Sequence, residues 1–232
     1  ATSLSTGEVL AFDGTNWINA GGNAGGLINL GNVSNVQIGG GAIGYVLQTD
    51  GLGNLSWTPK GAITAFIQNI TKSNTAANTP TIVKWNTLDA GSGFTLNTNS
   101  TATALISGVY KITYSLQFAN NDNAIHDAIV WLRVNGTVTT SANDLPNSTT
   151  VFTLQARKSA LLANYVCGYS EVVFTLNAGD SVGLWWGTDQ AATSGGATGI
   201  YIDYRAAQTS PMAYPAVPSA IGSITFVSAL PT

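Results

Sequence analysis

The sequence is poor in charged residues, and this scarcity excludes several classes of protein. Charged residues make up 8% of the 232 residues, against roughly 25% in an average soluble domain. The 8 lysines and arginines are scattered along the chain, with only Arg157 and Lys158 adjacent, whereas a protein that binds nucleic acid needs a basic surface. Only 2 glutamates are present, which excludes a coiled coil rich in Glu, Lys and Leu. We therefore expect neither nucleic-acid binding nor a fibrous helical architecture.

Cysteine is also scarce, and no segment has the composition of a membrane span. The single cysteine, Cys167, excludes an internal disulfide framework, and no Cys/His cluster has the spacing of a zinc site. We expect Cys167 to be a small buried apolar residue. No stretch approaches the roughly 20 apolar residues that cross a bilayer, and no basic region followed by an apolar run opens the chain. The sequence therefore predicts cytoplasmic synthesis, without a secretory signal or membrane insertion.

Apolar residues and glycine are what the chain has in quantity. Hydrophobic residues make up 44% of it, which is enough for a core of ordinary size and argues against disorder. The pattern changes near residue 60: residues 1–60 are rich in glycine and have little apolar periodicity, whereas residues 61–232 alternate between apolar and polar. We therefore expect two regions with a boundary there.

An internal repeat marks residues 1–60. Residues 7–17 and 44–57 share the skeleton Gly-x-Val-Leu-x-x-Asp-Gly, and each copy ends at a tryptophan. Each copy predicts a strand, an Asp-Gly turn and a second strand. One hairpin with a single tryptophan buries too little surface to be stable alone, so neighbouring chains must complete it. We expect residues 1–60 to form a glycine-rich β-hairpin stem that attaches the chain to other proteins.

Residues 61–232 read as a series of half-buried strands. The clearest is 108–118, where every second residue from Tyr110 to Phe118 is apolar. About nine or ten such segments, separated by turn signals and without a convincing helix, predict an all-β head domain over 61–232. The expected architecture is an antiparallel sandwich or jelly roll.

Several outward positions of these strands carry aromatic residues. Alternation directs Trp186 into the sandwich and Trp185 out of it, and it places Trp131 and Tyr201 outward as well. Outward aromatics on a charge-poor domain predict burial against another subunit, so Trp131, Trp185 and Tyr201 are our interface candidates. Trp185 is also open to interpretation as a platform for a sugar ring. Trp185 and Asp189 are accordingly the candidates for ligand contact.

Three motifs of the head resemble those of a known family. Gly108-Val109-Tyr110, residues 131–136 and residues 176–184 are similar, in this order, to the complement-type and tumour-necrosis-factor-like jelly rolls. The resemblance covers roughly residues 62–228 and implies a homotrimer. Residues 210–219 depart from it because they contain three prolines, which leaves the pairing of the last strand open.

The same resemblance implies a metal site. Some complement-type heads bind calcium near the trimer apex, and Asp122, Asp127 and Asp203 are candidate calcium ligands by analogy. No EF-hand spacing is present, so we expect no metal otherwise.

Signatures of catalysis are missing from the sequence. The only histidine, His126, lies between Asp122 and Asp127, where a solvated loop, a catalytic triad and a metal site are alternatives, of which we favour the loop. No Gly-x-Ser-x-Gly elbow occurs, and no spacing nominates a pair of carboxylates for glycoside hydrolysis. We expect a protein that is not an enzyme and that needs no cofactor.

The repeat of residues 1–60 resembles units of tailed-phage fibre and virion-appendage proteins. Together with the head, this predicts a virion structural protein: a trimeric bacteriophage fibre or appendage whose head is exposed for host attachment. Its expected partners are copies of itself, other virion proteins through residues 1–60, and host surface polysaccharide. The alternatives are a capsid decoration or cement protein and a lectin-like adhesin.

Overall fold

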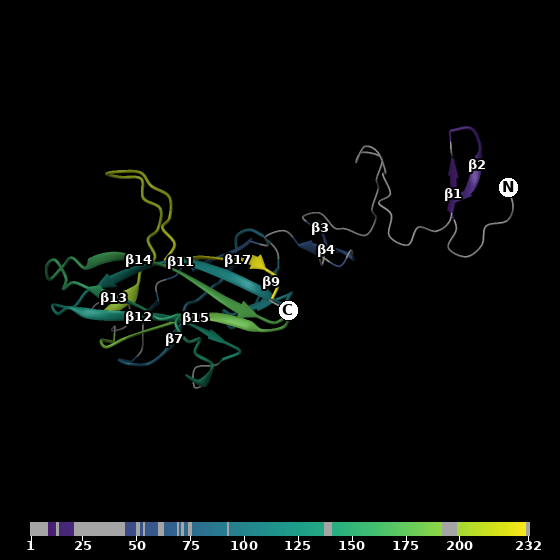
Figure 1. The fold of residues 1–232 in the computed structure, drawn as a ribbon. Helices are drawn as coiled ribbons and strands as arrows, with labels where there is room; N and C mark the ends of the chain where they lie inside the picture. Colours follow the sequence, from purple (N-terminus) through teal and green to yellow (C-terminus); the bar gives the residue numbers. More distant parts are fainter. Residues whose placement is uncertain are drawn as a thin grey trace. The chain divides into compact units, whose positions relative to one another are not determined.

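The protein is built almost entirely of β-strands and forms two compact units, residues 1–58 and 59–232 (Figure 1). A computed structural model describes residues 9–12, 14–20, 45–49, 52, 54–59, 63–68, 70, 72–73, 76–91, 93–136, 141–191 and 199–230. The helical structure among these residues is a 3₁₀ turn, Ser141–Asn143. No helix of the described residues is long and apolar enough to cross a membrane.

Each copy of the N-terminal repeat forms a hairpin. β1 (Val9–Phe12) pairs antiparallel with β2 (Trp17–Ala20), and β3 (Tyr45–Thr49) pairs with β4 (Leu55–Pro59). Gly14 has a φ of 102°, a conformation that glycine adopts without strain. The predicted strand–turn–strand unit is therefore confirmed in both copies, although Asp13, Asp50 and Gly51 of the turns lie outside the described residues.

The second unit contains two antiparallel sheets. One, here the β12 sheet, has the order β13 (Thr150–Leu154), β12 (His126–Val134), β15 (Ser181–Thr188), β10 (Ala102–Ala104) and β9 (Phe94–Leu96), with β7 (Thr81–Ile82) also on β15. The other, here the β11 sheet, has the order β6 (Lys72–Ser73), β16 (Ile200–Ile202), β11 (Gly108–Asn120), β17 (Ala220–Ser228), β5 (Ile63–Gln68) and β8 (Thr87–Leu88), with β14 (Asn164–Leu176) also on β11.

The chain passes repeatedly between these two sheets. It runs from β10 to β11, returns to β12 and β13, crosses to β14, returns to β15 and ends in β17. Successive crossings of this kind between two packed antiparallel sheets make a jelly roll. The predicted fold class is therefore confirmed by the strand order.

The core lies between the sheets and follows the predicted alternation. Every second residue of β11 from Tyr110 to Phe118 is buried, and Trp186 of β15 packs against Phe118 with ring centroids 5.9 Å apart. Gly222 of β17 leaves room for Trp85, because a Cβ at this glycine would stand 2.6 Å from the indole. The sandwich therefore has a dense aromatic interior that fixes the spacing of the two sheets.

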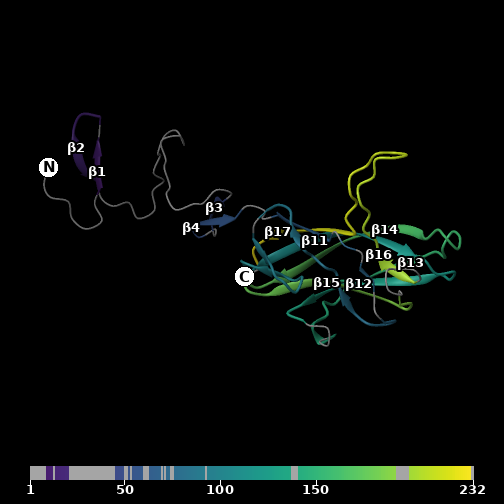
Figure 2. The ribbon, with the colours of Figure 1, turned by 180° about the vertical axis from the view of Figure 1, so that it is seen from behind.

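The last strand lies within the β11 sheet, whereas the proline-rich segment before it does not. β17 pairs antiparallel with β11 on one side and β5 on the other, which settles its pairing. Residues 203–219, here called the arm, form a long loop joined by bridges between Arg205 and Val217 and between Gln208 and Tyr214. The arm stands off the sandwich on the β11-sheet side (Figure 2).

The position of Cys167 differs from our expectation. It is exposed, because the odd-numbered residues of β14 point away from the core while Gly168, Phe174 and Leu176 point into it. The expectation of a buried thiol was wrong because residue type alone does not determine which face of a strand is covered.

Candidate functional site

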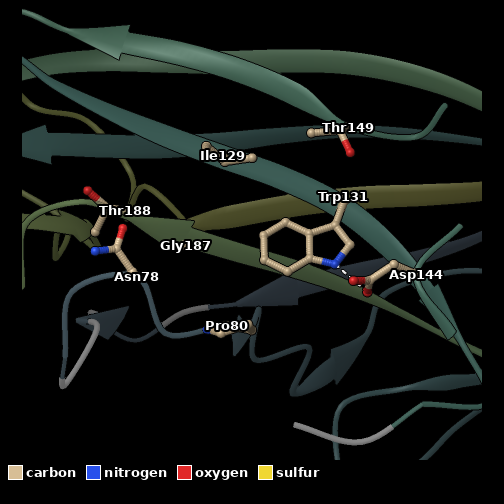
Figure 3. A pocket seen from close by; sticks show the side chains of 8 residues that line it. All are labelled: Asn78, Pro80, Ile129, Trp131, Asp144, Thr149, Gly187 and Thr188. Carbon is tan, nitrogen blue, oxygen red and sulfur yellow. Dashed lines mark hydrogen bonds between the residues drawn. The ribbon is translucent and has the colours of Figure 1, made fainter. Parts of the chain in front are cut away.

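A cleft lies on the outer face of the β12 sheet. Its volume is about 330 Å³, and eight residues from two strands and two connecting segments line it (Figure 3): Asn78, Pro80, Ile129, Trp131, Asp144, Thr149, Gly187 and Thr188.

The floor of the cleft comes from β12 and β15. Ala128, Val130 and Leu132 fill the core, so Ile129 and Trp131 point outward from β12. Gly187 of β15 is the register partner of Ile129 and has no side chain to occupy the space above it. A Cβ at Gly187 would meet the Trp131 ring at 3.8 Å, an ordinary contact distance. The absence of that one carbon therefore keeps the floor open.

Two connecting segments form the walls. On one side, the Asn78 backbone N–H donates to the Thr188 carbonyl over 2.8 Å, and β7 pairs with β15, so residues 78–82 are fastened along β15. On the other side, the Ser148 hydroxyl accepts from the Leu132 N–H over 3.0 Å, which holds the connection between β12 and β13 against β12. Both walls are therefore connected to the floor by hydrogen bonds.

A buried cation organises the polar end of the cleft. Asp144 Oδ1 accepts from Trp131 Nε1 and from Arg133 Nε, each over 2.6 Å (Figure 3 shows the first of these). Arg133 is 1% exposed, and its guanidinium carbon lies 4.5 Å from the centre of the Trp185 ring. A cation this deeply buried requires a charged partner, so Asp144 is held in place and in turn holds the Trp131 indole.

Trp185 points away from the core as predicted, but it is not exposed. Trp186 is in the core cluster and Trp185 is not, which agrees with the alternation. We expected another subunit or a sugar ring to cover Trp185, but within the single chain the side chain is already only 2% exposed. Arg133 stacks on its ring and Ile82 of β7 is its register partner, so the chain covers this position itself.

The other two interface candidates have different surroundings. Tyr201 points away from the main core as expected, but it is 8% exposed because it packs with Ala119 and Ala163 in a small separate cluster. Burial raises the pKa of its hydroxyl to about 12. Trp131 is half-buried in the cleft. A contact between Trp131 and another chain stays a prediction.

The three calcium candidates do not come together. Asp122 contacts His126, Asp127 accepts from the Thr153 hydroxyl over 2.7 Å, and Asp203 accepts from Arg205 Nε over 3.0 Å. Within the described part of the chain, no three acidic, histidine or cysteine side chains are grouped closely enough to hold a metal ion.

His126 is part of an ion-pair cluster rather than a solvated loop. Its ring is 10% exposed, with Nε2 2.8 Å from Asp122 and Nδ1 3.1 Å from Asp189. Burial opposes the charged imidazole, but hydrogen bonds and attraction from both carboxylates outweigh it and raise the pKa of His126. The same contacts lower the pKa of Asp122 and of Asp189. The predicted ligand-contact residue Asp189 is therefore engaged in connecting the end of β15 to the start of β12.

The outer face of the β11 sheet is open and carries several exposed apolar side chains. Tyr169 and Val173 of β14 are 63% and 61% exposed, and Ile221 and Val227 of β17 are exposed as well. Tyr169, Ser115 and Ile221 are cross-strand neighbours in one row, beside a depression of about 140 Å³. In this row, two large apolar side chains are therefore separated by a small polar one.

Sequence reasoning missed the residues that matter most at both faces. Asp144 and Asn78 lie far from Trp131 in sequence or outside any strand pattern, and only the register brings them to one cleft. The exposed apolar residues of β14 did leave a signal, since both sets of alternate positions in 165–173 contain large apolar residues.

The comparisons with known proteins find likenesses among solved structures alone. No protein-family model and no curated protein matches this sequence. A solved structure of Eiger TNF from S. frugiperda is similar with a TM-score of 0.46 and 11% sequence identity, over 74% of this chain and 96% of that chain. The jelly-roll assignment rests on the strand order of this chain itself.

Proposed function

We propose that this chain is a structural subunit of a tailed-bacteriophage particle: a homotrimeric fibre or appendage whose stem attaches to other virion proteins and whose head is exposed for attachment to the host. The observation that carries the proposal is the open apolar face of the β11 sheet. Exposed apolar patches of this kind mark association surfaces in soluble proteins.

The chemistry of this face favours a second copy of the chain as its occupant. Among the described residues, the ion pair across its strands is Lys111 with Glu171 at 3.3 Å, whose charges cancel, so nothing selects a strongly charged partner. Small residues such as Thr113 and Ser115 let another surface approach closely between the exposed side chains of Tyr169 and Ile221. In a homotrimer each interface joins two different patches, so we expect this face to pack against another patch of the neighbouring copy.

The arm supports the same proposal. It leaves the sandwich on the β11-sheet side, and Arg205 at its base stacks over Tyr165 of β14 with its guanidinium carbon 3.9 Å from the ring centre. Beyond this base, Met212 is exposed. An arm beside an open apolar face is placed to contact whatever copy covers that face.

The stem supports attachment and assembly on physical grounds. Its described hairpins are short, and Tyr45, Val46 and Leu55 are exposed. Two-stranded hairpins of this size are marginally stable alone, so other chains are expected to complete them. The resemblance of the repeat to phage-fibre units makes virion proteins the proposed partners.

Native mass spectrometry of the full chain tests the proposal. We expect a trimer, and we expect Ile221→Glu to yield folded monomers because it puts a charge into the open face. The matched control is Val151→Glu, which changes an exposed residue on the outer face of the β12 sheet and should leave the trimer intact. A wild-type monomer at micromolar concentration contradicts the proposal. Imaging of labelled particles then separates a fibre from a decoration protein, whose copies would cover the shell.

A further inference from the structure

We propose that the Trp131 cleft binds one uncharged pyranose ring of a polysaccharide, with the Trp131 indole as the stacking surface. The inference rests on the proposed attachment function and names the class of ligand for it. It moves the sugar-binding role from Trp185, which the chain covers, to the neighbouring outward tryptophan, its register partner across β12 and β15.

The apolar part of the cleft suits the C–H face of a sugar ring. Trp131 and Ile129 present apolar surface from β12, Pro80 adds a third apolar group, and Gly187 leaves the space between them open. Small-ligand sites combine such surfaces with a few placed polar groups. A volume of about 330 Å³ lies at the lower end of the roughly 300–1,000 Å³ typical of ligand pockets, which suits a single ring or a disaccharide.

The indole is oriented before any ligand arrives. Its Nε1–H donates to Asp144, and Asp144 is held by Arg133, which itself stacks on Trp185. An aromatic side chain that is already fixed loses little conformational entropy when a ligand stacks on it. The buried Arg133 therefore acts on the cleft through Asp144 as a positioning residue, while its own charge stays out of the cavity.

Hydroxyl groups of a sugar find donors and acceptors at the rim. A carboxylate has about four acceptor positions, and the bonds from Trp131 and Arg133 both end on Oδ1 of Asp144. Asn78 adds an amide and Thr149 a hydroxyl. These groups accept from and donate to hydroxyls, as a polyhydroxylated ring requires.

Charge selects a neutral sugar over an acidic one. Asp144 is the only ionisable residue among the eight that line the cleft, and Arg133, which partners it, is 1% exposed. A sugar carboxylate placed here would face a carboxylate without an accessible cation to offset the repulsion. Uronic and sialic acids are therefore expected to bind more weakly than neutral hexoses.

Ligand-observed NMR on the full-length protein tests this inference. The probes are the methyl pyranosides of glucose, galactose and mannose, with methyl glucuronide as the acidic comparison. We expect saturation transfer to at least one neutral pyranoside and a weaker signal from the glucuronide. We expect the affinity to fall about tenfold or more in Trp131→Ala, the usual effect of removing a central aromatic contact.

Two further variants control for misfolding. Gly187→Val places side-chain atoms above the floor, where its Cβ meets only ordinary contact distances, so it should abolish binding in a folded protein. Val151→Ala alters the same outer face outside the cleft lining and should bind like the wild type. The inference is overturned if no neutral pyranoside binds, if Trp131→Ala and Gly187→Val bind normally, or if the glucuronide binds as well as the neutral sugars.

These outcomes are separate from those of the assembly test. A trimer that binds no pyranoside overturns the cleft assignment and leaves the proposed assembly standing. A monomer that binds a pyranoside through Trp131 overturns the proposed assembly and leaves the cleft assignment standing.

Discussion

The outer faces of the two sheets of the head are built from similar strands, but they differ in how far the chain itself covers them. On the β12 sheet, the chain covers its own outward aromatic: Arg133 stacks on Trp185, and Asp144 pairs with Arg133. On the β11 sheet, Tyr169 and Val173 extend outward beyond the strands and are more than half exposed. The chain covers part of the first face with its own connections, and it leaves the second face largely open.

This difference follows from the connections and not from the strands. The segments 78–82 and 144–149 run beside β15 and β12 and supply the groups that cover Trp185 and flank Trp131. The arm at the end of the β11 sheet instead stands away from the sandwich (Figures 1 and 2). A face flanked by its own connections can hold a rigid cleft, such as the one proposed to bind a sugar, whereas an open face is suited to the proposed self-association.

The largest loss of stability is expected from a substitution in the core that the two sheets share. Tyr114→Ala removes a side chain that is 1% exposed and should lower the free energy of unfolding by about 3–5 kcal/mol, as truncation of buried aromatics does. Urea unfolding measures it. A loss below about 1 kcal/mol would mean that β11 does not present this residue to the core.

The next largest effect is the difference in stability that the ion pairs of the two faces contribute. Asp144→Ala removes the carboxylate that pairs with the buried Arg133, and we expect a loss of about 2–4 kcal/mol, since a buried charge that loses its counter-charge is costly. Glu171→Ala breaks the Lys111–Glu171 pair on the open face and should cost less than about 1 kcal/mol in the dissociated protein, because both side chains are more than a third exposed to water. Equal losses in chemical unfolding would remove the contrast between the faces.

The smallest change in stability is expected at His126, the first residue of β12. Its folded-state pKa is raised, so its contribution to stability is fully present below its unfolded value of about 6.5 and is lost as the pH rises through the folded value. The pKa values of Asp122 and Asp189 are lowered in the folded protein. The stability that these two carboxylates contribute through the cluster is therefore lost as the pH falls below about 4.

Unfolding of the wild type and of His126→Gln across this range measures the contribution of His126. The difference should be at most about 1 kcal/mol near pH 5 and should shrink toward pH 9. A difference that grows with pH would contradict the charged pairing of His126 with the two carboxylates.

Local alternation in the sequence predicted the strands, and the resemblance of three motifs to known jelly rolls predicted how they connect. Tyr110 to Phe118 alternate without a break, and all five apolar positions are buried. Alternation also separated Trp185 from Trp186 correctly. It assigns a side chain to a face of the sheet, and this much of the fold is local information.

What covers each face depends on partners that are distant in sequence. Trp185 and Tyr201 were expected to be covered by another subunit and are covered by the chain itself, and Cys167 was expected to be buried and is exposed. In the cleft, the contact between Trp131 and Asp144 depends on the path of the connection after β12. No periodicity encodes such a path, so the cleft was visible only in three dimensions.

The most direct test of the contrast between the faces uses Cys167, the only cysteine and an exposed residue of the open face. The rate of its alkylation by a bulky maleimide should be measured against protein concentration, with the Ile221→Glu variant as the reference. We predict that the wild-type thiol becomes protected as the concentration rises, while the variant reacts rapidly throughout. Equal, concentration-independent rates in both proteins would contradict burial of the β11 sheet against other copies of the chain.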